Sequence, residues 1–261
     1  MPQTHSASYK LAFQDIDFLL REDLRPVRFQ LELMKPEVLL DEANIVSTFV
    51  FYGSARIPSR EVAAAELETA KQGKGDLERA KMRLKMSRYY EDTRELARRL
   101  TLWSKSLEGT ERRFVVCSGG GPSIMEAANR GAHDVGAQTI GLNIVLPHEQ
   151  APNAYVTPDL SFNFHYFAIR KMHFLMRAKA VCVFPGGFGT LDEMFESLTL
   201  IQTGRMKPIP FLLFGREWWE TVINWTHLAD AGVIAPEDLS LFAMVETAEE
   251  AVAVIDGWGA Q

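Results

Sequence analysis

The sequence predicts an α/β protein of the Rossmann-like class, a doubly wound parallel sheet with extra helices at the N-terminus. Three observations favour this fold. Short apolar, β-branched runs alternate with longer amphipathic stretches along most of the chain. Several of these runs end in glycine-rich turns that lead into a helical pattern. The chain has 261 residues, 47% of them hydrophobic, which is enough to bury a sizeable core.

The N-terminal part of the chain differs in pattern from the rest. Residues 11–43 mix charges with Leu, Phe and Ile at helical spacing, and Pro26 and Pro36 interrupt them. We expect two or three short helices there, packed on the outside of the main domain. The sequence therefore predicts a helical extension over residues 1–44 and one α/β domain over residues 45–261.

The predicted domain alternates strands with helices. The expected strands cover residues 45–52, 114–117, 139–146, 180–184, 209–214 and 242–245. Residues 61–107 predict a short helix and then one long helix from about Asp76, with Gly73 and Gly75 between them. Further helices are expected over residues 123–135, 165–178, 190–203, 217–230 and 248–256. Such an alternation builds βαβ units, which form a parallel sheet covered by helices on both faces.

Composition excludes several classes of function. The formal net charge of −6 provides no overall field that would attract nucleic acid. The first residues lack the basic and apolar regions of a secretory signal, and no apolar run approaches the ~20 residues that cross a bilayer. We expect a cytoplasmic protein with neither nucleic acid nor membrane as a partner.

The cysteines and histidines predict no metal site. Cys117 and Cys182 each lie alone within an apolar run, which indicates buried thiols in strands rather than a disulfide or a zinc site. The histidines show no metal-ligand spacing. The sequence thus predicts no bound metal.

Small residues follow three of the predicted strands, where open parallel sheets bind their ligands. These turns are Gly53-Ser54, residues 119–121 and residues 186–189. Glycine lets the backbone approach a ligand, and the free amides of a following helix favour an anion such as phosphate. Glycine at a strand-to-helix turn also has a purely steric explanation, but two such turns in one sheet favour phosphate binding. Neither turn has Walker A or Gly-x-Gly-x-x-Gly spacing, which disfavours ATP hydrolysis and NAD chemistry.

The ionisable residues near the last turn allow two interpretations each. Glu193 follows Thr190 by three positions, so the two residues form either a capping box or part of a site with the carboxylate at its mouth. Arg170 and Lys171 lie in the helix before the same turn. They belong either to a solvated basic face or to the site, where Arg170 could bind a ligand phosphate bidentately.

Four segments together resemble a known family. PGGFGTLDE (residues 185–193) resembles the signature of the LOG family, the cytokinin riboside 5'-monophosphate phosphoribohydrolases that are often mislabelled as lysine decarboxylases. IRKMHF (169–174) resembles the upstream Arg-Lys pair of that family. SGGGPSIMEAANRGA (118–132) and FYGSAR (51–56) are similar to its first glycine-rich turn and first strand end. The likeness runs from about residue 46 to residue 245.

The resemblance implies cleavage of the N-glycosidic bond of AMP or an N6-modified AMP to a free base and ribose 5-phosphate. It implies a homodimer that needs no cofactor, with Arg170 and Glu193 as the catalytic pair. The predicted substrate-binding residues are Gly53, Ser54, Gly119, Gly120, Gly121, Met125, Lys171, Gly186, Gly187, Phe188, Gly189, Thr190, Leu191, Asp192 and Thr199. Ser123 departs from the family, because longer members have glycine there, and the N-terminal 45 residues and the helix near 76–107 are additional.

Two other functions fit parts of the sequence. A non-catalytic carrier of a nucleotide or of the molybdenum cofactor could use the same fold and glycine turns. A pyridoxal-phosphate decarboxylase needs a Schiff-base lysine against its cofactor ring, and no lysine in this sequence stands in such a context. The presence of both Arg170 and Glu193 favours the hydrolase, because a carrier has no need of that pair.

Overall fold

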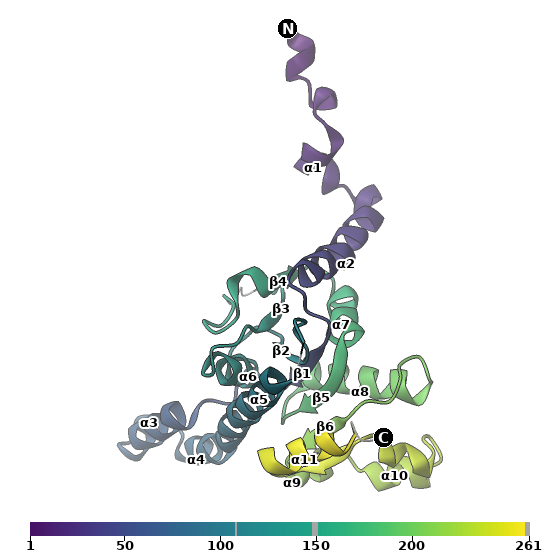
Figure 1. Ribbon diagram of the computed structural model, residues 1–261. Coiled ribbons are helices and arrows are strands. Elements are labelled where there is room, and N and C mark those ends of the chain that lie inside the picture. The colour runs from purple at the N-terminus through teal and green to yellow at the C-terminus, as the bar shows by residue number, and fades with distance from the viewer. Residues whose placement is uncertain (108, 148–150, 259–261) are drawn as a thin grey trace.

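One parallel sheet forms the centre of the molecule. The computed structural model describes residues 1–107, 109–147 and 151–258, and it holds a seven-stranded sheet in the order β4-β3-β2-β1-β5-β6-β7 (Figure 1). The strands are β1 (Thr48–Tyr52), β2 (Val115–Ser118), β3 (Ile140–Ile144), β4 (Ser161–Phe164), β5 (Ala178–Val183), β6 (Phe211–Phe214) and β7 (Ala243–Val245). Every neighbouring pair runs parallel. The predicted Rossmann-like class is confirmed.

The order of the strands creates a crevice beside β1. From β1 the chain winds outward through β2, β3 and β4, and it then returns to the other side of β1 to form β5, β6 and β7. The connections that follow β1 and β5 therefore lead towards opposite edges of the sheet. In open α/β sheets this change of direction opens a binding crevice at the carboxyl edge.

Alternate side chains of the central strand supply two separate cores. Phe49 and Phe51 of β1 pack with one group of helices, whereas Val50 and Tyr52 point to the other face. The first group comprises α5 (Arg88–Ser106), α6 (Ile124–His133) and α11 (Ala248–Trp258). The second comprises α2 (Arg25–Glu42), α7 (Phe167–Met176), α8 (Phe188–Gln202), α9 (Arg216–Val222) and α10 (Trp225–Asp230). Cys117 and Cys182 are free and buried in this sheet, as predicted.

Helices α5 and α6 make the closest helix contact of the first layer. Gly131 of α6 faces the backbone carbonyl of Arg94 so closely that a β-carbon would overlap it. The absent side chain at position 131 thus sets the distance between α5 and α6.

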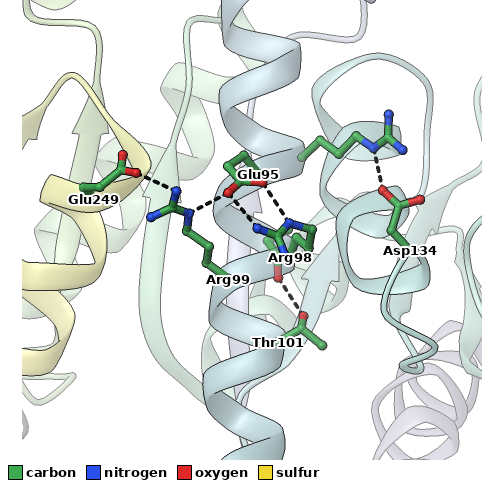
Figure 2. Close-up of polar contacts among 8 residues, drawn as sticks. Glu95, Arg98, Arg99, Thr101, Asp134 and Glu249 are labelled. Carbon is green, nitrogen blue, oxygen red and sulfur yellow. Dashed lines mark hydrogen bonds and ion pairs between the residues drawn. The ribbon is translucent and has the colours of Figure 1, made fainter.

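Polar contacts extend along α5 towards α11. Glu95 binds both Arg98 and Arg99, and Arg99 also binds Glu249 (Figure 2).

The structure differs from the prediction in three elements of the domain. The long helix expected from about Asp76 is two helices, α4 (Leu77–Met86) and α5, which meet at Ser87. The helix expected over 217–230 is also two, because the Asn224 side chain caps a new helix by accepting the His227 amide. Strand β4 was not predicted. The remaining helical elements are α3 (Arg60–Lys71) and the 3-10 turns Pro158–Leu160 and Pro236–Leu241.

The N-terminal helix α2 packs on the outside of the domain, as predicted, whereas the residues before it do not. Residues 25–42 form one helix that continues through Pro36, and α1 (Ile16–Leu19) precedes it among short 3-10 turns at Pro2–His5, Ala7–Tyr9, Ala12–Gln14 and Glu22–Leu24. The residues before α2 project away from the sheet at the purple end of the chain (Figure 1). Its apolar side chains, such as Leu11, Phe13 and Ile16, are exposed. Turns of three or four residues give no continuous apolar face to bury.

None of the helices in the described ranges is both long and apolar enough to span a bilayer. The last three residues of the predicted domain, 259–261, lie outside the described residues.

Gly131→Ala is expected to destabilise the protein by about 1–3 kcal/mol, because the added methyl group must push α6 away from α5. The matched control is Gly257→Ala in α11, where a β-carbon meets nothing within 4 Å. Replacing a solvent-facing helical glycine by alanine should raise stability by up to about 1 kcal/mol. Urea unfolding of the three proteins measures both effects. Equal stability of the two variants would contradict the close contact of α5 with α6.

Candidate functional site

A cavity of about 560 Å³ opens at the carboxyl edge of the sheet. The turns after β1, β2 and β5 and the end of β3 surround it, which is the crevice expected from the strand order. Its lining comprises Gly53, Ser54, Ala55, Arg56, Gly119, Gly121, Met125, Asn143, Ile144, Leu146, Arg170, Gly187, Phe188, Gly189, Thr190, Leu191 and Glu193. All three of the predicted turns therefore meet in one hollow.

Helix α8 begins at the cavity. Its first residue is Phe188 and its N-cap is Gly187, which has no side chain to satisfy the free amides of the first turn. Within the described chain, the amides of Phe188, Gly189 and Thr190 donate to no protein acceptor. Free amides at the positive end of a helix dipole form a site for an anion.

The predicted capping box does not form. Because α8 begins at Phe188, Thr190 lies inside the first turn and cannot be the N-cap. The Glu193 carboxylate turns instead towards α7, where Arg170 Nη1 donates to Glu193 Oε1 over 3.0 Å. Both side chains are largely buried, with 9% of Arg170 and 14% of Glu193 exposed. The structure thus excludes the alternative interpretation in which Glu193 only caps its own helix.

Arg170 is fixed on several sides. Its Nε donates to the carbonyl of Leu142 in β3 over 2.7 Å, and its guanidinium lies over the ring of Phe174. A β-carbon on Gly119 would come within 2.6 Å of Nη2, so the glycine turn packs directly against the guanidinium. Two of the three guanidinium nitrogens, Nε and Nη1, already donate to Leu142 and Glu193, which leaves Nη2 for a ligand. The expected bidentate grip on a phosphate is therefore not what this geometry favours.

Burial dominates the electrostatics of Glu193. Removal from water raises the pKa of its carboxyl group from the usual 4.5 to about 7, although the charge of Arg170 acts in the opposite direction. Asp192, the next residue, adds to the rise through its negative charge. Glu193 consequently changes its protonation state near neutral pH, as a general acid or base must.

The side-chain amides of Asn129 and Asn153 hold the first glycine turn in shape. Gly120 adopts a left-handed conformation with φ of 71°, and its amide donates to the Ser118 hydroxyl. Asn153 Nδ2 donates to the carbonyls of Gly120 and Gly121, and also to Asn129 Oδ1. Asn129 accepts a further hydrogen bond from Ser118. This network fixes the backbone that contacts Arg170.

The N-terminal helix α2 supports the helix that carries Arg170. The Glu32 carboxylate accepts hydrogen bonds from the amides of His165 and Tyr166 at the start of α7. Further along, Arg177 pairs with Glu37 and Asp41 of α2. A segment outside the predicted α/β domain therefore helps to set the position of the site.

Five predicted substrate-binding residues do not line the cavity: Gly120, Lys171, Gly186, Asp192 and Thr199. Lys171 points to the outer surface, where it pairs with Asp192 and Glu196, because consecutive helical residues diverge by about 100°. Thr199 is exposed farther along α8. Gly186 packs against the Thr190 side chain, and the side of Gly120 that a β-carbon would occupy faces Asn143.

Five lining residues were not predicted from the sequence: Ala55, Arg56, Asn143, Ile144 and Leu146. Two of them carried a signal. Arg56 belongs to the FYGSAR segment that directly follows the first strand, and Asn143 is a polar residue within an otherwise apolar strand run. Among the described residues, no group of three His, Cys, Asp or Glu side chains could hold a metal ion.

A family model described as possible lysine decarboxylase matches residues 125–255, half of the chain. The chain belongs to this family. It is the LOG family that the motifs resemble, and the matched range contains both Arg170 and Glu193.

Two curated LOG proteins of Arabidopsis thaliana are similar to this chain. The cytokinin riboside 5'-monophosphate phosphoribohydrolase LOG3 is 27% identical over 142 residues, which are 53% of this chain and 64% of that protein. The phosphoribohydrolase LOG7 is 27% identical over 150 residues, 56% of this chain and 67% of that protein. The match to LOG3 thus spans a little under two-thirds of the length of that relative.

Among solved structures, this LOG-family chain is similar to the molybdenum cofactor binding protein of Rippkaea orientalis. The TM-score is 0.49 and the sequence identity 15%, over 82% of this chain and 96% of the other.

The pKa of Glu193 makes the stability of the protein depend on pH. The unfolded chain releases this proton near pH 4.5 and the folded protein only near pH 7. The folded state binds more protons in this window, so the free energy of unfolding falls by about 3 kcal/mol as the pH rises through it. Glu193→Gln should remove this loss and should therefore gain stability relative to the parent between pH 4.5 and pH 7.

Denaturant unfolding at several pH values measures this difference. The control Glu196→Gln removes a carboxylate of the same helix that is 39% exposed, and it should not reproduce the gain of Glu193→Gln. Parallel stability curves for Glu193→Gln and the parent would contradict the burial of an ionisable Glu193.

Proposed function

We propose that this chain is a phosphoribohydrolase that cleaves the N-glycosidic bond of AMP or of an N6-modified AMP. The products would be a free base and ribose 5-phosphate. One observation carries the proposal: a buried carboxylate–guanidinium pair and a set of free helix amides line the same cavity. Membership of a family that includes named phosphoribohydrolases supports it.

The free amides at the start of α8 would bind the 5'-phosphate. Phe188, Gly189 and Thr190 offer three donors at the positive end of a 15-residue helix, so no cation is needed to hold the anion. Glu193 follows one helical turn later, a rise of about 5 Å. That offset allows a phosphate on the amides and a ribose ring beside the carboxylate.

Glu193 would act on the sugar and on water. As the bond between the anomeric carbon and the base nitrogen breaks, its electron pair leaves with the base and positive charge grows on the ribose ring. An ionised carboxylate beside the ring stabilises that charge. The same carboxylate can take a proton from the water that attacks the anomeric carbon, while the departing base gains a proton at its nitrogen.

Arg170 would hold Glu193 and contact the substrate with its remaining nitrogen. Its bond to the Leu142 carbonyl and its contact with Gly119 leave it little freedom to move. Nη2 could therefore polarise either the departing base or the ribose phosphate. In both cases a preorganised positive charge costs no reorganisation during the reaction.

A pyridoxal-phosphate decarboxylase, the activity in the description of the family, lacks support at this site. No lysine is among the described residues that line the cavity. Lys171 instead forms ion pairs on the outer surface. The homodimeric state and the cytoplasmic location implied by the resemblance stay predictions.

Replacing Glu193 by Gln should lower the release of adenine and ribose 5-phosphate from AMP at least about 100-fold, because the neutral amide neither stabilises an oxocarbenium ion nor accepts a proton. Chromatography of the free base measures the rate. Glu196→Gln, one turn away on the same helix, should keep the parent activity. A Glu193→Gln rate close to that of the parent would remove Glu193 from the mechanism.

The same assay separates the hydrolase from a carrier. If the parent chain binds AMP and releases no base, the non-catalytic nucleotide carrier becomes the better explanation of the site. The phosphate subsite would then remain, whereas the catalytic role of the buried pair would not.

The dependence of kcat/KM on pH should follow the ionisation of Glu193. If the carboxylate must be ionised, kcat/KM falls about tenfold for each pH unit below the pKa of about 7 and levels off above it. Initial rates with AMP between pH 5 and pH 9 test this. A profile that stays flat from pH 5 to pH 7 would show that no group with this pKa takes part.

A further inference from the structure

A second cavity adjoins the catalytic cavity on the side of α4 and α6. It measures about 480 Å³ and shares Ala55 and Arg56 with the first. The turn after β1, the helices α3, α4 and α5, and the start of α6 enclose it. Helix α4 belongs to the part of the chain, near residues 76–107, that is additional to the compact proteins resembled above.

Positive charge concentrates in this second cavity. Arg56, Arg79 and Arg83 all line it, and Glu126 is the carboxylate among its described lining residues. Glu126 already accepts a hydrogen bond of 2.6 Å from the buried Tyr90 hydroxyl. Three guanidinium groups thus face one carboxylate that is partly engaged elsewhere.

Two of the three arginines have no partner in the described structure. Arg83 is paired with Glu66 through Nε and Nη2, at 2.6 and 3.0 Å. The side chains of Arg56 and Arg79 form neither an ion pair nor a hydrogen bond with any described residue, and both are exposed. Arg79 and Arg83 are also four positions apart on α4, a spacing at which like charges repel on a helix surface. Glu66, which binds Arg83, offsets part of this repulsion, and an anion at Arg79 would offset more of it.

A rigid turn separates the two cavities. Arg83 Nη1 donates to the carbonyl of Arg56 over 3.0 Å, and the Ser123 hydroxyl donates to the carbonyl of Ile57. The Ser54 amide donates to the carbonyl of Pro185, just before the turn into α8. Arg83, which binds Glu66, thus also fixes the turn at Arg56 that forms part of the wall of the catalytic cavity.

We propose that Arg56 and Arg79, beside Arg83, form a second anion site, which binds a phosphate group next to the nucleotide cavity. Planar guanidinium groups match phosphate oxygens bidentately, and the side chains of Arg56 and Arg79 have no acidic partner among the described residues. Arg83 already donates to Glu66 and to the Arg56 carbonyl, so it positions Arg56 and does not itself grip the phosphate. This site does not require that the chain cleave nucleotides. Its phosphate has two sources: a further phosphate on the bound nucleotide, or a separate small anion.

Titration of the full chain with inorganic pyrophosphate, followed by calorimetry, tests the site. The parent should show two binding events, one at the start of α8 and one at the arginines. Arg79→Gln should weaken the second at least about tenfold, the effect of losing roughly one charge-assisted contact. Arg205→Gln, an exposed arginine just beyond the far end of α8, is the matched control and should bind as the parent does. Identical titrations of the parent and Arg79→Gln would overturn the proposal.

Nucleotide titrations distinguish the two sources of the phosphate. They use Glu193→Gln as the starting protein, so that hydrolysis does not interfere, and this choice rests on the proposed function. If the nucleotide carries the group, adenosine 3',5'-bisphosphate should bind about tenfold more tightly than AMP, and a further Arg79→Gln change should abolish that gain. If the anion is separate, the two nucleotides should bind alike and pyrophosphate should still bind in the presence of AMP. Failure of the proposed function would appear as a lack of nucleotide binding, which leaves the effect of Arg79→Gln on pyrophosphate intact.

Discussion

The contact between Arg170 and Glu193 is the constraint on which the site depends. A carboxylate this far from water is costly to ionise unless a cation lies against it. The cation in turn needs a fixed position, which the Leu142 carbonyl and the Phe174 ring provide. Position 119 must then be glycine, because the guanidinium occupies the space that any side chain would fill. The helix α2, which caps α7 through Glu32, adds to this support.

Local patterns were enough to predict much of the fold. The run at residues 45–52 is apolar on both faces, as a central parallel strand requires, and it forms β1 between β2 and β5. The glycine turn at residues 186–189 was expected to precede a helix, and α8 starts there. The lining residues Gly53, Gly119 and Gly187 follow from the same reasoning, because the carboxyl ends of parallel strands share one edge of the sheet.

The remaining features depend on contacts between distant residues. Strand β4 has four residues, of which Asn163 is exposed. An alternation of buried and exposed residues over so short a run is too brief to recognise in the sequence. Its pairing with β3 defines the strand. The break at Ser87 interrupts a helical pattern that continues on both sides of it. Asn143 and Arg56 reach the cavity through the order of the strands and the path of the turn after β1, and Lys171 leaves it through the rotation of α7. The spacing of residues along the chain does not predict the directions in which these side chains point.

The buried pair and the outer walls of the cavity have different attachments. Arg170 is tied to the backbone of the sheet, whereas Leu146 lies beyond the end of β3, and Phe188, at the mouth, is 93% exposed. Substitutions at Leu146 and Phe188 can therefore accumulate over evolutionary time without disturbing the guanidinium or the carboxylate. A lineage that keeps Gly119, Arg170 and Glu193 could acquire a new ligand preference through its rim alone. Divergence in specificity with unchanged chemistry is the expected history of such an architecture.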